Sequence, residues 1–260
     1  MGKFDGILIC SDWDGTLFTG ECVPEESKRA IKYFQENGGK FTLCSGRPPF
    51  YIKEMLESIH PNTYTLALNG TVICDMDTDE IIKESFIDDD AYRIADELIN
   101  SGIEIINVVS CMKEMSDYYR QPTAQFYADI PWLKTMSVYK LAVTCADPND
   151  GDRLMEFAKT VNTGKYSIQR SARGYAEIIL TEFSKGNAAR ALKEMIGADL
   201  LISMGDYEND IPAFEKADVS YAVANAVPHL KAIATHVTKA TVDECAVAEI
   251  IADIEKRYAK

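Results

Sequence analysis

Hydrophobic and polar positions along the first quarter of the chain predict strands and helices in turn. The apolar runs at 6–11, 41–44 and 65–68 are short and continuous, as in strands that are buried on both faces. The pattern between them predicts helices over 24–37 and 48–59. Strand and helix alternating in this order favours a parallel sheet with helical crossovers.

The pattern changes at residue 75 and changes back at residue 184. Strand-like runs at 81–86, 103–109, 139–144, 166–169 and 176–180 mix with helical patterns at 90–99 and 150–161. The alternation then returns, with a helix at 186–196, a strand at 200–204, a helix from 208, strands at 219–223 and 236–238, and a helix at 242–258. We therefore predict one α/β core formed by 1–74 and 184–260, interrupted by an inserted α+β domain over 75–183.

Composition and charge limit the partners. The 260 residues are 47% hydrophobic and 26% charged, which is typical of a globular chain with a buried core. The 41 acidic and 27 basic side chains give a net charge of -14, which repels nucleic-acid phosphates and anionic lipid. No apolar run approaches the roughly 18 residues of a membrane span, and the amino terminus lacks a signal-peptide pattern. We expect a cytoplasmic monomer or weak homodimer without nucleic-acid or membrane partners.

Polar residues follow the predicted core strands where each strand ends. In open parallel sheets, ligands bind outside the carboxyl ends of the strands, so these residues are expected to converge. Three polar clusters follow strand ends: Asp12-Trp13-Asp14-Gly15-Thr16, Ser45-Gly46-Arg47 and Gly205-Asp206-Tyr207-Glu208-Asn209-Asp210. A fourth, Lys185-Gly186, opens the helix just before the strand at 200–204 and is expected at the same edge.

The residue types in these clusters indicate phosphate chemistry with a hard cation. Several carboxylates without a neighbouring histidine or cysteine favour Mg²⁺. A lysine and a serine at the same edge supply the positive charge and the hydrogen-bond donor that a phosphoryl group needs. Asp12 and Asp14 are two residues apart and Gly15 allows a turn directly after them. This arrangement suits a carboxylate nucleophile beside a general acid and base.

On these motifs the sequence resembles the haloacid dehalogenase (HAD) superfamily, in its Cof-type sugar-phosphatase branch (class IIB, with a C2-type cap). The motifs that carry the resemblance occur in the family's order: Asp12-x-Asp14-Gly15-Thr16, Ser45, Lys185 and Gly205-Asp206-x-x-Asn209-Asp210. The resemblance implies a Rossmann-like parallel-sheet core with an inserted α+β cap that selects the substrate. The chain departs from relatives in its bulky Trp13 and in Ala222-Val223-Ala224-Asn225-Ala226, where they usually carry Met-Gly-Asn-Ala.

The resemblance also implies catalytic roles. Asp12 would attack phosphorus and become an aspartyl-phosphate. Asp14 would protonate the leaving alkoxide and then deprotonate the water that hydrolyses the intermediate. Ser45 and Lys185 would bind the phosphoryl oxygens, and Lys185 would also offset the charge of the surrounding carboxylates.

The remaining candidates are metal ligands and substrate contacts. The resemblance implies Mg²⁺ held by a carboxylate oxygen of Asp12, the backbone carbonyl of Asp14 and the carboxylate of Asp206. Asn209 and Asp210 would complete the metal site directly, through water or by orienting Lys185. On the substrate side the candidates are Ser45, Gly46, Arg47, Asn69 and Lys185. Arg47 could instead pair with a core carboxylate, and Asn69-Gly70 could simply form a hairpin turn.

We therefore predict a Mg²⁺-dependent phosphatase of small phosphomonoesters such as sugar phosphates. One alternative is a phosphosugar mutase of the phosphomannomutase type, which accepts a bisphosphate and should favour a basic cap. The segment 75–183 has 20 acidic and 11 basic residues, which argues for hydrolysis. A catalytically silent module that binds phosphorylated ligands is the alternative from outside the enzymes, and the intact motifs argue against it. A dehalogenase is disfavoured because paired carboxylates suit Mg²⁺ and phosphate.

Overall fold

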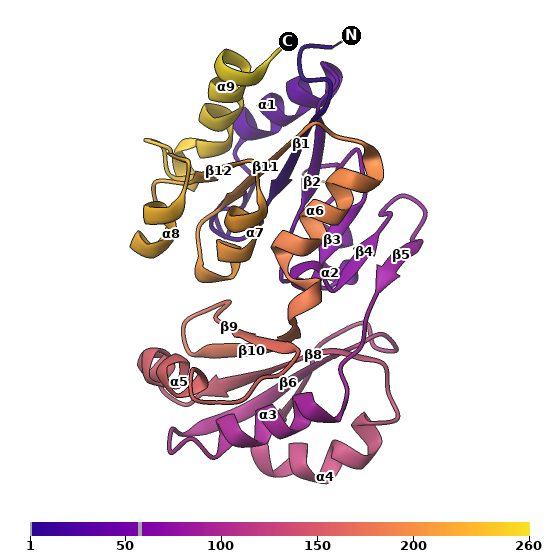
Figure 1. Ribbon diagram of the computed structural model, residues 1–260, viewed down its shortest axis with the longest axis vertical. Helices are drawn as coiled ribbons and strands as arrows, with labels where there is room; N and C mark the ends of the chain where they lie inside the picture. Colours follow the sequence, from indigo (N-terminus) through magenta and orange to yellow (C-terminus); the bar gives the residue numbers. More distant parts are fainter. Residues whose placement is uncertain (1, 57–58) are drawn as a thin grey trace. The chain divides into compact units, whose positions relative to one another are not determined.

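A computed structural model describes residues 2–56 and 59–260, and the chain divides into two compact units. The first, here called the core unit, comprises the residues up to Lys83 together with Ser184–Lys260, and the second, the insert unit, comprises Glu84–Phe183 (Figure 1). The insert unit begins later than the 75 expected from the sequence, because the segment after residue 75 forms a hairpin with the core strand before it. The assignment of the two units to catalysis and substrate selection stays a prediction.

The core unit contains the predicted parallel sheet. Its five strands lie in the order β13-β12-β11-β1-β2. Their bounds are β1 (Ile7–Ser11), β2 (Lys40–Leu43), β11 (Leu200–Gly205), β12 (Val219–Ala222) and β13 (His236–Val237). Strand β1 lies between β11 and β2 and all five of its residues are buried, which explains its continuous apolar run. The expected α/β fold class is confirmed.

Helices cover this sheet. They are α1 (Glu25–Glu36), α2 (Pro49–Met55), α6 (Lys185–Ile196), α7 (Ile211–Lys216), α8 (Pro228–Ile233) and α9 (Ala246–Tyr258). Helix α1 packs against α9, and α6 packs against α7, as Figure 1 shows. Leu8 and Cys10 of β1 form one apolar cluster with Ala189 and Leu192 of α6, since alternate strand residues point to the same face.

Two predicted helices of the core unit differ from expectation. The helix expected at 48–59 is shorter, ending at Met55, and part of that range lies outside the described residues. The helix expected at 242–258 is interrupted at Cys245, whose φ of 66° belongs to the left-handed region. Helix α8, which begins at Pro228, was not predicted, because its six residues are too few to show a helical period.

A small second sheet in the core unit has the strand order β3-β4-β5, with β3 (Thr65–Ala67), β4 (Val72–Cys74) and β5 (Ile81–Glu84). Strands β3 and β4 are antiparallel. The turn between them has positive φ at three successive residues, 52° at Leu68, 57° at Asn69 and 93° at Gly70. The predicted turn at Asn69-Gly70 is therefore present, and it begins one residue earlier, in a conformation that is strained for a leucine.

The insert unit is an antiparallel sheet with helices on one face. The strand order is β7-β6-β8-β10-β9, with β6 (Ile105–Met112), β7 (Tyr119–Pro122), β8 (Val138–Cys145), β9 (Tyr166–Gln169) and β10 (Tyr175–Leu180). The helices are α3 (Asp89–Ile99), α4 (Thr123–Leu133) and α5 (Gly151–Ala158). Side chains from all three helices join one apolar cluster with the sheet.

The sequence missed β7 and α4. Strand β7 reads Tyr-Arg-Gln-Pro, which is short and polar, and α4 carries Pro131 in its interior. Both features argue against regular structure in a single sequence. In the part of the chain that the structure describes, no helix has the length and apolar character needed to cross a membrane.

Candidate active site

Asp12 follows directly after strand β1, and its side chain is buried, with 6% of the residue exposed. Its backbone N–H donates to the Met204 carbonyl of the neighbouring strand at 2.9 Å. Trp13 turns inward, is almost fully buried, and stacks on Phe18 with ring centroids 5.4 Å apart. The bulky residue noted as a departure thus anchors the loop that carries Asp12.

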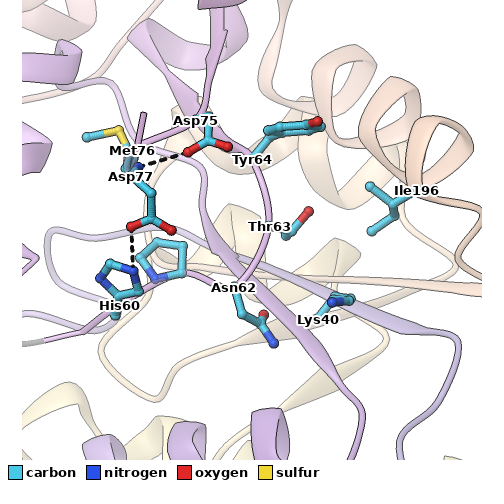
Figure 2. Close-up of a pocket in the computed structure, with 10 residues that line it drawn as sticks. Lys40, His60, Asn62, Thr63, Tyr64, Asp75, Met76, Asp77 and Ile196 are labelled. Atoms are coloured by element: carbon cyan, nitrogen blue, oxygen red, sulfur yellow. Dashed lines mark hydrogen bonds and ion pairs between the residues drawn. The ribbon is translucent and has the colours of Figure 1, made fainter. Parts of the chain in front are cut away.

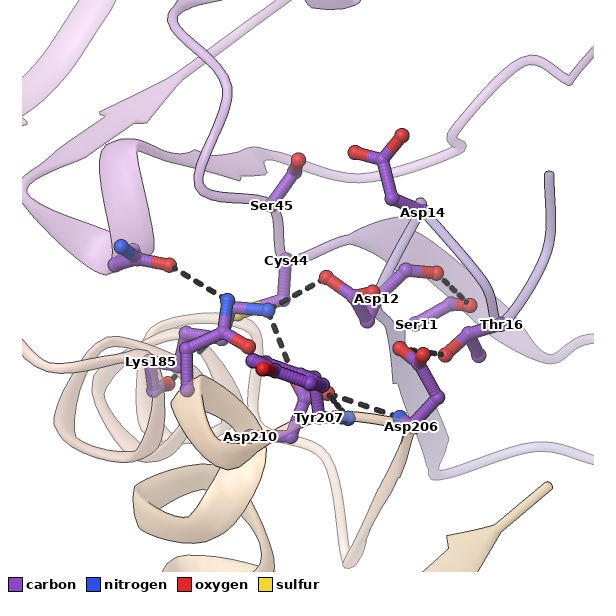
Figure 3. A network of polar contacts seen from close by, with 12 residues as sticks. Ser11, Asp12, Asp14, Thr16, Cys44, Ser45, Lys185, Asp206, Tyr207 and Asp210 are labelled. Carbon is purple, nitrogen blue, oxygen red and sulfur yellow. Dashed lines mark hydrogen bonds and ion pairs between the residues drawn. The ribbon is translucent and has the colours of Figure 1, made fainter. Parts of the chain in front are cut away.

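Lys185 lies between two carboxylates at the first residue of α6. Its Nζ donates to Asp12 Oδ1 and to Asp210 Oδ1, both at 2.6 Å (Figure 3). The side chain of Lys185 is 1% exposed, so this ammonium group has little contact with water. Asp210 also accepts backbone hydrogen bonds from Asp206 at 3.0 Å and Tyr207 at 3.2 Å, which fix its carboxylate.

A third carboxylate completes the cluster. Oxygen atoms of Asp12, Asp206 and Asp210 all lie within 4.8 Å of one another. Thr16 donates to Asp206 Oδ1 at 3.3 Å and so orients this carboxylate. We call Asp12, Asp206, Asp210 and Lys185 the carboxylate cluster, and it unites residues from three of the four predicted motifs.

Burial and repulsion dominate the protonation of the carboxylate cluster. Burial raises the pKa of Asp12 well above its usual value; Lys185 opposes this, and Asp210 and Asp206 add to it. Burial and the neighbouring Asp210 raise the pKa of Asp206 to about 7. Burial alone would lower the pKa of Lys185, but Asp12 and Asp210 outweigh it and the pKa rises. Lys185 therefore stays charged.

The carboxylate cluster fits a divalent cation. If all three carboxylates were ionised, the single ammonium group would leave two negative charges without compensation in a buried place, and this cost is what raises the pKa values of Asp12 and Asp206. All the donor atoms are carboxylate oxygens, which hard cations such as Mg²⁺ prefer. Asp12, Asp206 and Asp210 are thus the residues that could hold the metal.

The carboxylate of Asp14 lies outside this cluster. The guanidinium of Arg47 binds it in a fork, with Nε to Oδ2 at 2.8 Å and Nη2 to Oδ1 at 2.6 Å. The Asp14 side chain is 55% exposed, in contrast to the buried carboxylates of the cluster. Arg47, for which pairing with a carboxylate was the alternative to binding phosphate, therefore pairs with Asp14 in this structure.

Ser45 and Asn69 come from adjacent segments. Ser45 is buried two residues after the end of β2, and its hydroxyl accepts a hydrogen bond from the Arg47 backbone N–H at 3.1 Å. Asn69 lies in the left-handed turn, and its backbone N–H donates to the Ser45 carbonyl at 2.8 Å. Its side-chain oxygen accepts from Asn209 Nδ2 at 3.4 Å. The turn therefore ties the serine loop to Asn209.

Two glycines lie so close to carboxylates of the cluster that a side chain would not fit at either position. A Cβ at Gly15, whose φ is +74°, would lie 2.4 Å from Asp206 Oδ2. A Cβ at Gly205 would lie 2.4 Å from Asp210 Cγ. Any larger residue at either position would displace a carboxylate of the cluster.

Two positioning residues were not singled out from the sequence. Thr16 orients Asp206, as described above, and was read only as part of a motif. Asn225 donates to the Gly15 carbonyl at 2.7 Å and accepts from the Val242 backbone N–H at 2.8 Å, so it holds the loop after Asp14. The departure at 222–226 contained the signal, because the segment keeps the asparagine and the alanine after it while the two residues before them change.

A pocket of about 550 Å³ lies elsewhere in the core unit (Figure 2). Its lining includes Lys40, which begins β2, whereas Ser45 follows the end of that strand; the pocket is therefore at the opposite edge of the sheet. It contains a contact between His60 Nε2 and Asp77 Oδ1 at 2.8 Å. None of the predicted site residues lines it.

Comparison with known proteins agrees with this geometry. The family model of the haloacid dehalogenase-like hydrolase matches residues 9–251, a span that includes every predicted site residue. The chain belongs to this hydrolase family. Membership confirms the resemblance stated from the motifs, while the role of each site residue stays a prediction.

Individual relatives cover nearly the whole chain. "Putative phosphatase YxeH" of Bacillus subtilis is 28% identical over 89% of this chain and 92% of its own length. The 5-amino-6-(5-phospho-D-ribitylamino)uracil phosphatase YwtE of the same organism is 27% identical over 94% and 96%. A solved haloacid dehalogenase-like hydrolase from B. subtilis superposes with a TM-score of 0.77 at 22% identity, covering 96% of this chain and 99% of that one. The last likeness shows that the fold is shared.

Proposed function

We propose that this HAD hydrolase is a Mg²⁺-dependent phosphatase that cleaves small phosphomonoesters through an aspartyl-phosphate at Asp12. The observation that carries the proposal is the pairing of Asp12 with Lys185 inside the carboxylate cluster, with Asp14 two residues further along the same loop. Two relatives that are named as phosphatases match this chain over almost their full length and support the reaction class.

Asp12 has the position of the nucleophile. Its Oδ1 is held by Lys185, which leaves the second carboxylate oxygen to form a bond to phosphorus while the bond from phosphorus to the leaving oxygen breaks. Lys185 keeps its positive charge next to the reacting group and offsets the charge that develops on the phosphoryl oxygens. The Ser45 hydroxyl would donate to one of these oxygens.

Asp14 would move the protons. In the first step its carboxyl group gives a proton to the leaving alkoxide, and in the second its carboxylate takes a proton from the water that attacks phosphorus and releases phosphate from Asp12. Each oxygen of Asp14 accepts one hydrogen bond from Arg47 in this structure and keeps a second lone pair on which a proton can be carried. Arg47 is thus a positioning residue for Asp14, and Gly46 and Asn69 shape the loop that holds it.

Asp12, Asp206 and Asp210 would hold the metal, with the Asp14 carbonyl and Asn209 at the same edge. When bound there, Mg²⁺ would polarise a phosphoryl oxygen and neutralise the excess charge of the carboxylates. In a chain of net charge -14 this neutralisation makes an anionic substrate acceptable.

Phosphate release from a panel of phosphomonoesters with Mg²⁺ tests the proposal. Asp12→Asn should lower turnover at least about 10³-fold, because the nucleophile is lost, whereas Asp243→Asn, at an exposed carboxylate of the same unit, should retain turnover. Acid-quenched wild-type enzyme should carry a phosphoryl group on the peptide that contains Asp12. Equal turnover in the wild type and Asp12→Asn, or no release from any ester, would overturn the proposal.

A further inference from the structure

The turn between β3 and β4 holds a leucine in a backbone conformation that leucine rarely adopts. The φ angle is 52° at Leu68, and positive values follow at Asn69 and Gly70. A positive φ is unfavourable for a residue with a β-carbon, and glycine and asparagine tolerate it best. Leu68 keeps this angle because the surrounding contacts impose it, and backbone strain of this kind is typical of functional sites.

Two backbone hydrogen bonds show what the turn holds. The Leu68 N–H donates to the Arg47 carbonyl at 3.0 Å, and the Asn69 N–H donates to the Ser45 carbonyl at 2.8 Å. Both acceptors belong to residues 45–47, the serine loop. The peptide group after Leu68 carries the Asn69 N–H, so the φ and ψ angles of Leu68 set the angle between the two N–H groups. With a negative φ at this residue, the two hydrogen bonds could not form together.

The same turn contacts the segments that carry the carboxylate cluster. Asn69 Oδ1 accepts from Asn209 Nδ2 at 3.4 Å, and Asn209 directly precedes Asp210. The turn also packs against α6, whose first residue is Lys185. Leu68 and Asn69 are both 0% exposed, so the turn has no free volume in which to shift. It therefore connects the serine loop to the carboxylate cluster within the core unit.

Close packing transmits the position of the turn to the serine loop. A Cβ at Gly46 would lie only 3.1 Å from Asn69 Oδ1, so the two segments are in direct contact. Within the loop, the Arg47 N–H donates to the Ser45 hydroxyl, and the Arg47 guanidinium binds Asp14. A rotation of the turn would therefore displace the Ser45 hydroxyl and, through Arg47, the carboxylate of Asp14.

We propose that Leu68 is a positioning residue for phosphoryl transfer. Its positive φ holds the Ser45 hydroxyl and the pair of Arg47 and Asp14 in register with the carboxylate cluster. A residue that returns this φ to negative values breaks one of the two hydrogen bonds, and a displacement of about 1 Å at a reacting group can lower the rate about 100-fold. The inference rests on the proposed function and adds a residue outside the four motifs.

Two substitutions that conserve volume separate the backbone role of Leu68 from packing. Leu68→Met keeps the unbranched β-carbon, whereas Leu68→Ile is branched there and opposes a positive φ. We expect kcat/KM for glycerol 1-phosphate with Mg²⁺ to fall about 10- to 100-fold in Leu68→Ile and to stay near the wild-type value in Leu68→Met. Circular dichroism at the assay temperature verifies that both variants are folded.

The matched control places the same substitution two residues earlier. Leu66 in β3 is also 0% exposed, but it lies in a strand, where β-branched residues are favourable. Leu66→Ile should retain the wild-type kcat/KM. Equal values in Leu68→Ile and Leu68→Met would assign Leu68 to packing alone and overturn the inference.

The leaving group supplies a second kinetic readout. Glycerol leaves as an alkoxide that needs a proton from Asp14, whereas p-nitrophenolate leaves without one. The loss of kcat/KM in Leu68→Ile should therefore be larger for glycerol 1-phosphate than for p-nitrophenyl phosphate. An equal loss on the two esters would indicate a smaller amount of active protein rather than a displaced loop, and would overturn the inference.

Two truncations keep the inference testable if Leu68→Ile does not fold. Leu68→Gly removes one carbon more than Leu68→Ala, so a packing role predicts that the glycine variant is the less active of the two. The inference predicts the reverse, because glycine adopts the positive φ freely and alanine does not. We expect kcat/KM to be several-fold higher in Leu68→Gly than in Leu68→Ala. An equal or lower value would overturn the inference.

Hydrogen exchange reads the turn without any turnover. The Asn69 amide should be protected from exchange in the wild type and in Leu68→Gly, and should exchange faster in Leu68→Ile, as measured by NMR. An unprotected Asn69 amide in the wild type would overturn the inference. A wild type that releases no phosphate from any ester would overturn the proposed function, whereas an active wild type with an equally active Leu68→Ile would overturn the role of Leu68 alone.

Discussion

Among the residues that the structure describes, two lysines are buried, and the carboxylates beside them differ. Lys185 in the core unit bonds to two aspartates and lies beside a third, so negative charge exceeds positive charge there. Lys140 in the insert unit bonds to Glu177, and the two charges balance. A balanced pair satisfies itself, whereas an unbalanced cluster needs a further cation. The excess of negative charge beside Lys185 supports the proposal of a metal at the carboxylate cluster.

The largest effect on stability is expected at Lys185. Lys185→Met should lower the free energy of unfolding by about 3–5 kcal/mol in metal-free buffer at neutral pH, because several buried carboxylates lose their only cation. Lys256→Met, at an exposed position of α9, should change it by less than about 0.5 kcal/mol. Urea unfolding of both variants measures the difference. Similar stability of the two variants would remove the contrast between the buried lysines.

A second substitution should restore the stability lost in Lys140→Met, but not the stability lost in Lys185→Met. Lys140→Met should cost roughly 3 kcal/mol, and adding Glu177→Leu should restore stability to within about 1 kcal/mol of the wild type, since no charge then remains buried. Adding Asp210→Asn to Lys185→Met should restore much less, because Asp12 and Asp206 remain. A double-mutant cycle by urea unfolding checks this, and equal rescue at both sites would contradict it.

Mg²⁺ should stabilise the protein through the carboxylate cluster and not through the Lys140–Glu177 pair. The change in stability should be smaller than that caused by the lysine substitutions. At about 100 times its dissociation constant, Mg²⁺ should stabilise the wild type by roughly 2.7 kcal/mol and raise its Tm. Asp206→Asn should weaken this shift and Lys140→Met/Glu177→Leu should leave it intact. Thermal melting in Mg²⁺ and in EDTA gives the readout. An equal shift in Asp206→Asn would place the metal away from the carboxylate cluster.

Asp218 is more exposed than the carboxylates of the cluster, and its substitution should give the smallest change in stability. Burial raises the pKa of Asp218, but hydrogen bonds from Lys193, the Leu201 backbone and Arg190 outweigh it and lower the pKa to about 2. Its folded pKa is below the value of about 3.9 in unfolded chains, so its stabilisation is present above about pH 4 and is lost as the pH falls toward about 2.

Asp218→Asn should therefore cost roughly 1 kcal/mol at neutral pH, a modest amount because solvent screens this group. The difference from the wild type should shrink as the pH falls below about 4. Urea unfolding across this range measures both values. A cost that stays constant with pH would assign the effect of Asp218 to packing rather than to charge.

The parts of the fold that the sequence predicted are those whose signal is local. Strand β1 and helix α6 were found because burial on both faces or one face leaves a continuous or periodic apolar pattern. Strand β7 and helix α4 were missed because a polar edge strand and a helix containing Pro131 carry no such pattern. Their positions depend on pairing with β6 and packing on the sheet, which are long-range contacts.

By itself, the sequence determined the α/β core, the four motifs and the identity of the candidate catalytic residues, because these follow from local patterns and from the edge at which parallel strands end. Only the tertiary structure decided which residues meet: that Lys185 bridges Asp12 and Asp210, that Arg47 holds Asp14, and that Lys140 pairs with Glu177 in the insert unit. Lys185 lies 173 positions from Asp12 and 25 positions from Asp210 in the sequence. Arg47 lies 33 positions from Asp14, and Lys140 lies 37 positions from Glu177. Contacts over such separations are set by sheet register and helix packing, which no local pattern encodes.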